Sequence, residues 1–309
     1  MPSSSAVAWS LTALAATCPL MLAPAMDGGM FAHAATQANL ALIRKRGAIV
    51  VGPEEGHLAS GSHGVGRMVE PGELLGHIRL ALSRGGPLHG RKVLVTAGGT
   101  QESIDPVRMI TNRSSGKQGY ALAQAALDLG ADVTLVSAPV GLPEIVGVRC
   151  VEVRSAKEML DSVLAALPET DVLVMAAAVA DFRPANPAGE KIKKGDAIPE
   201  IRLERTADIL LDVAKSRDQS GRPRLVVGFA AESSHLLENA HAKLEAKRLD
   251  MVVANDISAP DAGFGFDTNR VTLLEVDKEP QPLPLMSKEG VGVSVMERVS
   301  ELLLARDQV

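Results

Sequence analysis

Few cysteines, few aromatic residues and little net charge are the first features of this sequence. Its 309 residues include only two cysteines, Cys18 and Cys150, which cannot build a disulfide framework and do not lie in a Cys/His spacing typical of zinc sites. Aromatic residues make up 2% of the chain, and the formal net charge is −5. A net negative charge of this size does not favour nucleic-acid binding, because it implies no basic surface. A reducing compartment fits best, and we expect cytoplasmic localisation.

A positively charged start and an unbroken apolar run are also missing. Residues 6–26 are apolar and rich in alanine, but no Lys or Arg precedes Arg44, whereas a signal peptide opens with positive charge. Pro19 and Pro24 interrupt the stretch, which argues against a membrane span. We expect no membrane association, and predict the end of a helix followed by a buried strand over residues 20–23. A cleaved signal peptide stays open as the alternative.

The sequence contains two blocks of alternating strand and helix patterns. Residues 1–82 form the first block, and residues 83–90, SRGGPLHG, have the composition of a linker. Residues 91–309 form the second block. In the first block the pattern predicts helices over 36–46 and 71–83, a short strand over 48–51 and a glycine-rich loop over 56–68.

The second block predicts a Rossmann-like, doubly wound parallel sheet. Short runs of Val, Leu and Ile predict buried strands over residues 92–97, 132–137, 171–177, 225–230, 251–255 and 270–276. Helical spacing follows at 120–129, 155–167, 206–216, 235–249 and 290–306, and a glycine-rich loop is expected over 261–269. In an α/β sheet of this kind the ligand site lies at the carboxyl ends of the strands.

The stretch 92–119 combines a strand, a glycine turn and a helix start. Gly98 and Gly99 allow a sharp turn and a close approach of a ligand to the backbone, and a helix N-terminus favours anions. Gly116-Lys117 lacks the other residues of a P-loop, and the glycines do not give a dinucleotide fingerprint. From this pattern alone, a nucleotide or phosphate site and an ordinary strand-to-helix turn are equally favoured.

The full string GGTQESIDPVRMITNRSSGKQG, residues 98–119, closely resembles the signature of phosphopantothenate–cysteine ligase, the second half of the bacterial bifunctional coenzyme A biosynthesis protein. The resemblance implies that 4′-phosphopantothenate is activated with CTP to an acyl-cytidylate, which L-cysteine attacks. It implies a metal held by carboxylates, Mg²⁺ as we expect, although the residues do not identify it, and a homodimer. The residues alone do not decide between CTP and ATP.

The resemblance also assigns roles to particular residues. Lys191, in the lysine cluster EKIKK, matches the catalytic lysine, and Asn112 matches the asparagine that handles the acyl-cytidylate. Arg108 suits the phosphopantothenate carboxylate or phosphate, because guanidinium binds both bidentately. The plainer alternatives are a solvated charge run for Lys191, a turn or helix cap for Asn112 and a surface position for Arg108.

Further residues are implied as nucleotide or metal ligands. The implied nucleotide contacts are Gly98, Gly99, Ser114, Ser115, Gly116, Ala177, Ala178, Asp181, Phe229, Lys243, Lys247 and Asn255. Asp181 and Asp208 are the candidates for the metal. An acidic residue in a first helical turn, such as Asp208, is also ordinary compensation of the helix dipole, and Lys243 and Lys247 could equally form a solvated basic face.

Residues 24–31, PAMDGGMF, and the glycine-rich stretch 56–68 are similar to the C-terminal half of phosphopantothenoylcysteine decarboxylase, a flavodoxin-like flavoprotein family. Asp27 stands where that family has asparagine, and Ser60 where it usually has a reactive cysteine. The family's N-terminal half has no counterpart in this chain. We therefore expect a partial, flavodoxin-like remnant, which would bind FMN only if that half were supplied.

Three hypotheses follow. The first is a ligase with a decarboxylase remnant in front of it. The second is a fully bifunctional enzyme that also decarboxylates phosphopantothenoylcysteine with FMN, and the third is a non-catalytic nucleotide-binding regulator. The expected partners are the small-molecule substrates 4′-phosphopantothenate, L-cysteine and CTP, without nucleic acid or membrane.

Overall fold

The computed structural model describes residues 4–193, 200–232, 234–256 and 266–308. The chain divides into two compact units, Met1–Arg84 and Gly85–Val309. The expected loop over 261–269 lies mostly outside the described residues, although Thr268–Asn269 forms a short strand, β15.

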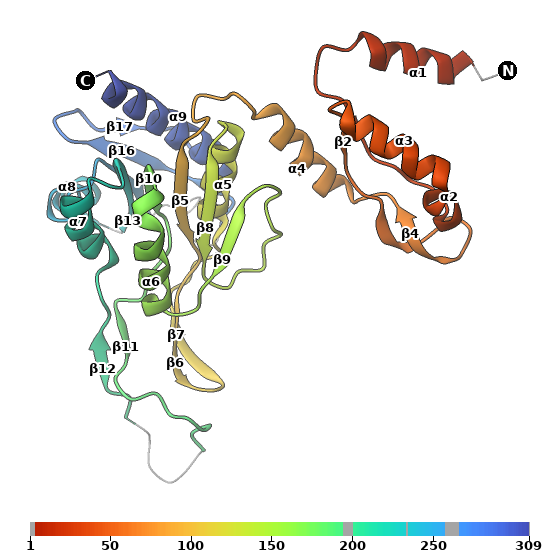
Figure 1. Ribbon diagram of the computed structural model, residues 1–309. Helices are drawn as coiled ribbons and strands as arrows, with labels where there is room; N and C mark the ends of the chain where they lie inside the picture. The colour runs from red at the N-terminus through yellow and green to blue at the C-terminus, as the bar shows by residue number, and fades with distance from the viewer. Residues whose placement is uncertain (1–3, 194–199, 233, 257–265, 309) are drawn as a thin grey trace. The chain divides into compact units, whose positions relative to one another are not determined.

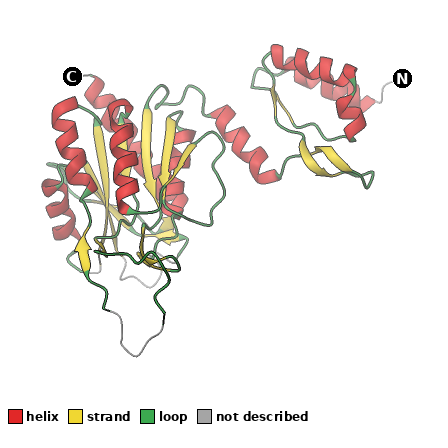
Figure 2. Ribbon diagram, turned by 60° about the horizontal axis from the view of Figure 1, so that its bottom comes forward, coloured by secondary structure: helices red, strands yellow, loops and turns green. Residues whose placement is uncertain are grey.

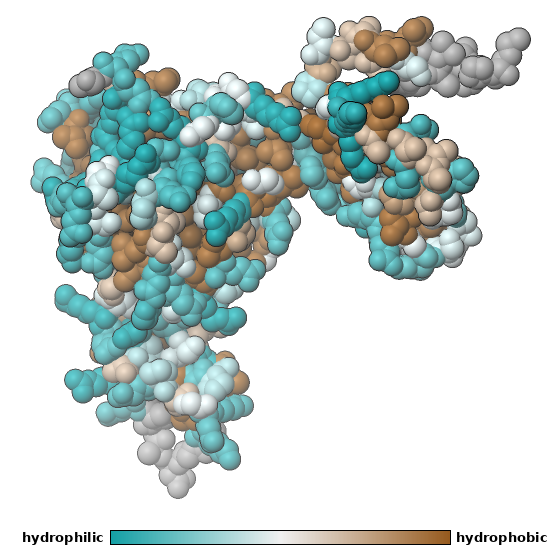
Figure 3. All heavy atoms as spheres, in the orientation of Figure 1, coloured by the Kyte–Doolittle hydropathy of each residue, from teal (hydrophilic) through white to brown (hydrophobic). Residues whose placement is uncertain are grey.

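The first unit consists of short elements. Its helices are α1 (Ser4–Ala15), α2 (Gly28–Ala32), α3 (Ala34–Lys45) and α4 (Pro71–Leu82). Strands β1 (Met21–Leu22) and β2 (Ile49–Val50) pair in parallel, and β3 (Glu54–His57) pairs with β4 (His63–Arg67). The strand predicted over 20–23 is shorter and half-buried. Figure 3 shows hydrophobic side chains on the surface of this unit, and its exposed hydrophobic residues include Leu14, Met30, Leu42 and Leu75.

The prediction of a loop over residues 56–68 is wrong, because most of this segment belongs to the β3–β4 hairpin. Glycine-rich segments are often loops, but two of these glycines allow close packing. A Cβ on Gly56 would lie 2.7 Å from Arg67 Cδ, and one on Gly66 would lie 2.0 Å from the Met26 carbonyl oxygen. Glycine in a strand can mark such a close approach of another backbone.

The second unit contains an eight-stranded sheet with the order β17-β16-β14-β13-β10-β5-β8-β9. Its parallel strands are β5 (Lys92–Ala97), β8 (Asp132–Ser137), β9 (Arg149–Glu152), β10 (Val172–Met175), β13 (Leu225–Glu232) and β14 (Met251–Asp256). Read from β9, their chain order is 3-2-1-4-5-6, the classic doubly wound arrangement. The fold prediction is confirmed. The sheet is extended by β16 (Val271–Glu275), which pairs antiparallel with β14, and by β17 (Gln281–Pro282), which pairs antiparallel with β16.

Helices cover both faces of this sheet (Figures 1 and 2). Helices α6 (Ala156–Ala166), α7 (Ile209–Ser220) and α8 (Leu236–Ala246) pack on one face, where Met159, Val213 and Leu244 join one core with the strands. Helices α5 (Lys117–Asp128) and α9 (Lys288–Asp307) pack against each other and cover the other face. The chain passes from one face to the other between β5 and β10, which places a crevice at their carboxyl ends.

Several boundaries differ from the predictions. The segment between the glycine turn after β5 and the next helix contains a hairpin, β6 (Gln101–Asp105) and β7 (Arg108–Thr111), and α5 begins at Lys117 rather than Tyr120. Helix α7 begins at Ile209 rather than at residue 206. Helix α6 is capped by Ser155, whose hydroxyl accepts from the Glu158 N–H at 3.2 Å.

Two further pairs of short strands and one turn complete the second unit. Strands β11 (Phe182–Pro184) and β12 (Leu203–Arg205) pair antiparallel, as do β15 and β18 (Met286–Ser287). A 3₁₀ turn, η1 (Leu167–Glu169), follows α6. In Figure 1 the β6–β7 hairpin and the β11–β12 pair extend from the carboxyl ends of the sheet.

Candidate functional site

A large cavity lies at the carboxyl ends of the central strands. Its volume is about 1140 Å³, and it is lined by residues at or just after the carboxyl ends of β7, β10, β12, β13 and β14. The N-termini of α5 and α9 also reach it, through Gly116 and Lys288. This is the position at which doubly wound sheets bind ligands, because the loops after β5 and β10 diverge there.

Most of the predicted site residues line this one cavity. They are Asn112, Ser114, Ser115, Gly116, Ala177, Ala178, Asp181, Asp208, Phe229, Lys243, Lys247 and Asn255. They come from positions up to 143 residues apart in the chain, from Asn112 to Asn255 (255 − 112). The structure therefore brings together the signature after β7, the alanine-rich segment after β10 and the lysines of α8.

Gly98 and Gly99 do not line the cavity. Gly98 has a φ of +80°, and a Cβ there would lie 3.0 Å from the Ala138 carbonyl oxygen. A Cβ on Gly99 would lie 2.7 Å from the Asn112 carbonyl oxygen. These glycines let neighbouring segments pack closely beneath the cavity, so they shape the site without facing a ligand.

Arg108 and Lys191 also lie outside the residues that line the cavity. Arg108 is on β7, and its guanidinium donates to Asp105 Oδ2 (Nε, 2.9 Å) and to the Ile192 carbonyl oxygen (2.8 Å). Lys191 is exposed and directly precedes Ile192. Arg108 therefore bonds the residue that follows Lys191, and neither residue lines the cavity of its own chain.

Asn112 joins the two loops that form the floor of the cavity. Its side-chain Nδ2 donates to the Val179 carbonyl oxygen at 3.0 Å and is 3.4 Å from that of Ala178. The loop after β10 is held from below as well, because Thr96 Oγ1 accepts from the Ala177 N–H and Thr100 Oγ1 from the Ala180 N–H. The alanine-rich segment thus has a fixed backbone, and its small side chains leave room above it.

Basic side chains lie on one wall of the cavity. The Lys243 Nζ donates to the Phe229 carbonyl oxygen at 2.5 Å, and Lys247 forms an ion pair with Asp208. Asp208 Oδ1 also accepts from the Leu211 N–H at 3.2 Å, as the N-cap of α7. Asp208 is therefore the N-cap of α7, one residue before the first turn where compensation of the helix dipole was the alternative to metal binding, and it still faces the cavity.

Sequence reasoning missed Lys288, Gln118 and Asn269, which form the opposite wall. Lys288 is only 6% exposed, although it is the first residue of α9. Burial and the nearby charge of Lys117 lower the pKa of Lys288, and Asp267 acts in the opposite direction. A lysine at a helix N-terminus opposes the helix dipole, and that unfavourable position was the signal available in the sequence.

Gln118 joins the two helix N-termini at this wall. Its Nε2 donates to the Lys288 carbonyl oxygen at 3.1 Å, and its Oε1 is 3.4 Å from Asn269 Nδ2. Asn255, on β14, also lines the cavity and is 8% exposed. Among the described residues, its Oδ1 has no hydrogen-bond partner. A buried acceptor of this kind is available to a donor group on a ligand.

Carboxylates are sparse in the described part of the cavity. Asp181 and Asp208 line it, and among the residues described no group of three or more His, Cys, Asp or Glu side chains could hold a metal ion. Magnesium is commonly held by one or two carboxylates together with substrate phosphates. The two aspartates fit that kind of site and do not form a complete cage for a cation.

In the first unit, the two residues that depart from the decarboxylase pattern contact each other. The Ser60 hydroxyl donates to Asp27 Oδ2 at 2.7 Å and lies 2.8 Å from the Ser62 hydroxyl. The hydrogen bond from Ser60, with that from the Gly29 N–H, lowers the pKa of Asp27. Asp27 also caps α2 through Gly29.

Comparison with known proteins decides the family. Residues 88–303 match the model of the DNA/pantothenate metabolism flavoprotein C-terminal domain, and residues 3–83 match the flavoprotein model. The coenzyme A biosynthesis bifunctional protein CoaBC of Bacillus subtilis (strain 168) is 42% identical over 294 residues, which are 94% of this chain and 71% of that protein. The chain belongs to the CoaBC family.

Other relatives agree with this assignment. CoaBC of Mycobacterium tuberculosis (strain ATCC 25618 / H37Rv) is 44% identical over 304 residues, which cover 94% of this chain and 72% of that protein. A cysteine/cysteine sulfinic acid decarboxylase from an unknown prokaryotic organism is 41% identical over 295 residues, 94% of this chain and 81% of that protein. The crystal structure of the C-terminal domain of a CoaBC protein has 39% identity and a TM-score of 0.60, and covers 72% of this chain and 100% of its own.

The family places the chain in coenzyme A biosynthesis and gives both parts of the chain a relative. The resemblances found in the ligase signature and in residues 24–31 are confirmed at the level of the family.

Within the described residues, none of the helices combines the length and apolar character needed to cross a membrane.

Proposed function

We propose that this CoaBC-family chain is a cytoplasmic phosphopantothenate–cysteine ligase that uses CTP. The observation that carries the proposal is the single cavity lined by the signature after β7, the alanine-rich segment after β10 and two lysines of α8. The N–H groups at the start of α5, the positive helix end and the lysine side chains favour a polyphosphate there.

The reaction has two steps. A carboxylate oxygen of 4′-phosphopantothenate attacks the α-phosphorus of CTP, the bond to pyrophosphate breaks, and an acyl-cytidylate forms. The amine of L-cysteine then attacks the acyl carbon, the bond to CMP breaks, and a proton leaves as the amide forms. The carboxylate needs this activation because it is a poor electrophile at neutral pH.

Two residues have the central roles. Lys191 would offset the negative charge that develops at the α-phosphate in the first step. Asn112 would donate one amide N–H to the acyl carbonyl oxygen in the second step, while its contact with the Val179 carbonyl oxygen fixes the side chain. Preorganised donors of this type stabilise charge as it develops in the transition state.

The cavity also suits the other components. Asp181 and Asp208 would hold Mg²⁺ together with the triphosphate oxygens, and the bound ion would neutralise part of their charge. The buried acceptor of Asn255 suits the exocyclic amino group of cytosine. We also infer a homodimer. Arg108 and Lys191 lie outside the cavity of their own chain, so they would take part in the reaction if they reached the cavity of a second copy of the chain.

Pyrophosphate release tests the proposal. Purified protein is mixed with CTP, Mg²⁺, 4′-phosphopantothenate and L-cysteine, and we expect pyrophosphate in step with phosphopantothenoylcysteine. Lys191→Gln should lower the rate of the first step at least about 100-fold, the usual effect of removing one charge-stabilising group. Lys215→Gln is the matched control, since Lys215 is an exposed lysine paired with Asp212 on α7. Equal rates for Lys191→Gln and the wild type would remove Lys191 from the mechanism.

A second candidate is FMN-dependent decarboxylation of the ligase product, in addition to the ligase reaction. The match of residues 3–83 to the flavoprotein model favours it. The pairing of Ser60 with Asp27 argues against the usual chemistry, because a serine hydroxyl is a far weaker acid than a cysteine thiol. A preparation that carries flavin and releases CO₂ from phosphopantothenoylcysteine would support the bifunctional enzyme.

A further inference from the structure

Asp105 lies at the centre of a set of hydrogen bonds that joins two distant segments. Its side chain is fully buried at the end of β6. Oδ1 accepts from the N–H groups of Val107 and Arg108, both at 2.9 Å, and Oδ2 accepts from Arg108 Nε at 2.9 Å. The first two bonds close the β6–β7 turn, and their acceptor belongs to the DPVR part of the signature.

The same carboxylate holds the segment that carries Lys191. The Ile192 N–H donates to Asp105 Oδ2 at 3.1 Å, and the Ile192 carbonyl oxygen accepts from Arg108 at 2.8 Å. A third bond joins the Ala188 N–H to the Ile104 carbonyl oxygen at 2.9 Å. Residues 188–192 are thus attached to the hairpin on both sides of Lys191.

The ionised form of Asp105 suits this arrangement. Hydrogen bonding from Arg108 holds the pKa of Asp105 well below its usual range, although burial acts to raise it, and the N–H groups of Val107, Ile192 and Arg108 lower it further. An ionised carboxylate accepts at both oxygens, and charge-assisted hydrogen bonds are roughly twice as strong as neutral ones. Asn in its place would present one oxygen and one donor, so it could not accept all of these bonds.

We propose that Asp105 and Arg108 form a clamp on Ile192 that positions Lys191 for the first step of the ligase reaction. Asp105 is therefore a positioning residue, and the structure gives Arg108 a task besides the substrate contact expected from the sequence. The inference rests on the proposed function only for the role of Lys191. The attachment of residues 188–192 to the hairpin can be tested without turnover.

Limited proteolysis tests the attachment directly. Trypsin cleaves after Lys191 and Lys193, and mass spectrometry identifies the fragments. Asp105→Asn should raise the rate of cleavage at these two sites at least fivefold, while Asp161→Asn, which removes an exposed carboxylate paired with Lys157, should leave it unchanged. Unchanged cleavage in a folded Asp105→Asn protein would overturn the clamp.

Arg108→Lys provides a second variant in case Asp105→Asn does not fold. Lysine keeps the charge but lacks the fork that contacts Asp105 and Ile192 together, so cleavage after Lys191 should again rise at least fivefold. Cleavage at the wild-type rate in this variant would equally overturn the proposal.

Kinetics separate positioning from a general structural role. In folded Asp105→Asn, kcat for pyrophosphate release should fall at least tenfold, with KM for CTP within threefold of the wild type. Loss of activity with wild-type cleavage would overturn the clamp, and so would faster cleavage with unchanged kcat. If the wild type released no pyrophosphate from CTP, the proposed function would fail, while the proteolysis result would still decide whether the attachment exists.

Discussion

Buried charged residues in the second unit are paired across long distances in the sequence. Glu275, on β16, has a side chain that is 9% exposed and accepts from Arg298 of α9, at 2.6 Å from Nε and 3.0 Å from the terminal nitrogen. Lys278 adds a third contact at 2.6 Å. Burial acts to raise the pKa of Glu275, but the bonds from Arg298 and Lys278 outweigh it, so the pKa is lowered.

This pair predicts a pH dependence of stability. A carboxyl group with a lowered pKa in the folded state stabilises the protein above its unfolded pKa, and that contribution is lost as pH falls through the folded value. Glu275→Gln should therefore cost about 2 kcal/mol at neutral pH, and the difference from wild type should shrink below about pH 4. Urea unfolding from pH 7 to pH 3 measures it.

Glu301→Gln is the control for that series. Glu301 contacts the same arginine, but its side chain is 64% exposed, so we expect at most about 0.5 kcal/mol. A constant Glu275→Gln difference over the whole pH range would show that packing rather than charge accounts for the pair.

At the scale of elements, the position of α5 depends on one glycine. A Cβ on Gly119 would lie 2.5 Å from the Ala97 Cβ and 2.9 Å from the Thr96 carbonyl oxygen. Helix α5 can therefore approach β5 closely only because residue 119 has no side chain. This approach sets the place of Gly116 and the α5 N-terminus at the cavity.

Gly119→Ala should move α5 away from the sheet. We expect a loss of about 1–3 kcal/mol in the free energy of unfolding, as for other overpacked sites, together with weaker CTP binding. Gly290→Ala in α9 is the control, because the nearest atoms to its Cβ would all belong to the Met286 side chain, with the sulfur closest at 3.3 Å. Thermal unfolding and nucleotide titration measure the two effects. A fully stable Gly119→Ala protein with wild-type affinity would contradict this account of the packing.

Elements with strong periodicity were predicted well, and short or irregular ones were not. Strands 92–97 and 132–137 were found with their predicted bounds, because buried parallel strands form continuous apolar runs. The β6–β7 hairpin was missed, because its sequence does not alternate clearly between apolar and polar residues, the usual pattern of a half-buried strand. The clamp of Asp105 on Ile192 could not be predicted either, because it joins residues 87 positions apart.

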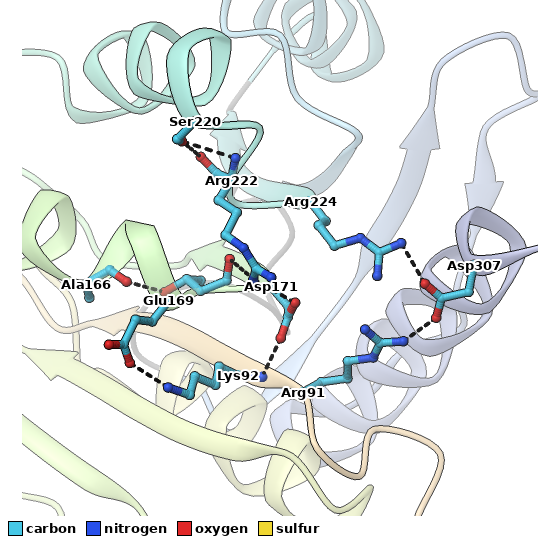
Figure 4. Close-up of polar contacts among 10 residues, drawn as sticks. Arg91, Lys92, Ala166, Glu169, Asp171, Ser220, Arg222, Arg224 and Asp307 are labelled. Atoms are coloured by element: carbon cyan, nitrogen blue, oxygen red, sulfur yellow. Dashed lines mark hydrogen bonds and ion pairs between the residues drawn. The ribbon is translucent and has the colours of Figure 1, made fainter. Parts of the chain in front are cut away.

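At the scale of the second unit, charged residues join the end of the chain to the start of the sheet. Figure 4 shows Arg91 and Arg224 both directed at Asp307, near the end of α9. In the same view, Asp171 accepts from the Lys92 N–H and from Arg222, each at 2.9 Å. These pairs hold the amino ends of the strands and the C-terminal helix together, away from the cavity.

Asp307→Asn should weaken this attachment. Its side chain is 30% exposed, so we expect a loss of about 1 kcal/mol at low salt. The difference from wild type should fade in 1 M salt, where the screening length is about 3 Å. Urea unfolding at the two salt concentrations checks it, with Asp161→Asn as a surface control. A loss that is independent of salt would point to packing of α9 instead of charge.

The sequence by itself determined the family, the doubly wound α/β class and most residues of the candidate site. These follow from local features: apolar runs, helical spacing and a signature of 22 consecutive residues, 98–119. Only the tertiary structure decided that Gly98 and Gly99 serve packing, that Lys288, Gln118 and Asn269 join the cavity wall, and that Arg108 bonds Ile192, the residue after Lys191. Such contacts depend on the order of strands in the sheet and on close approach between distant segments, which no local pattern encodes.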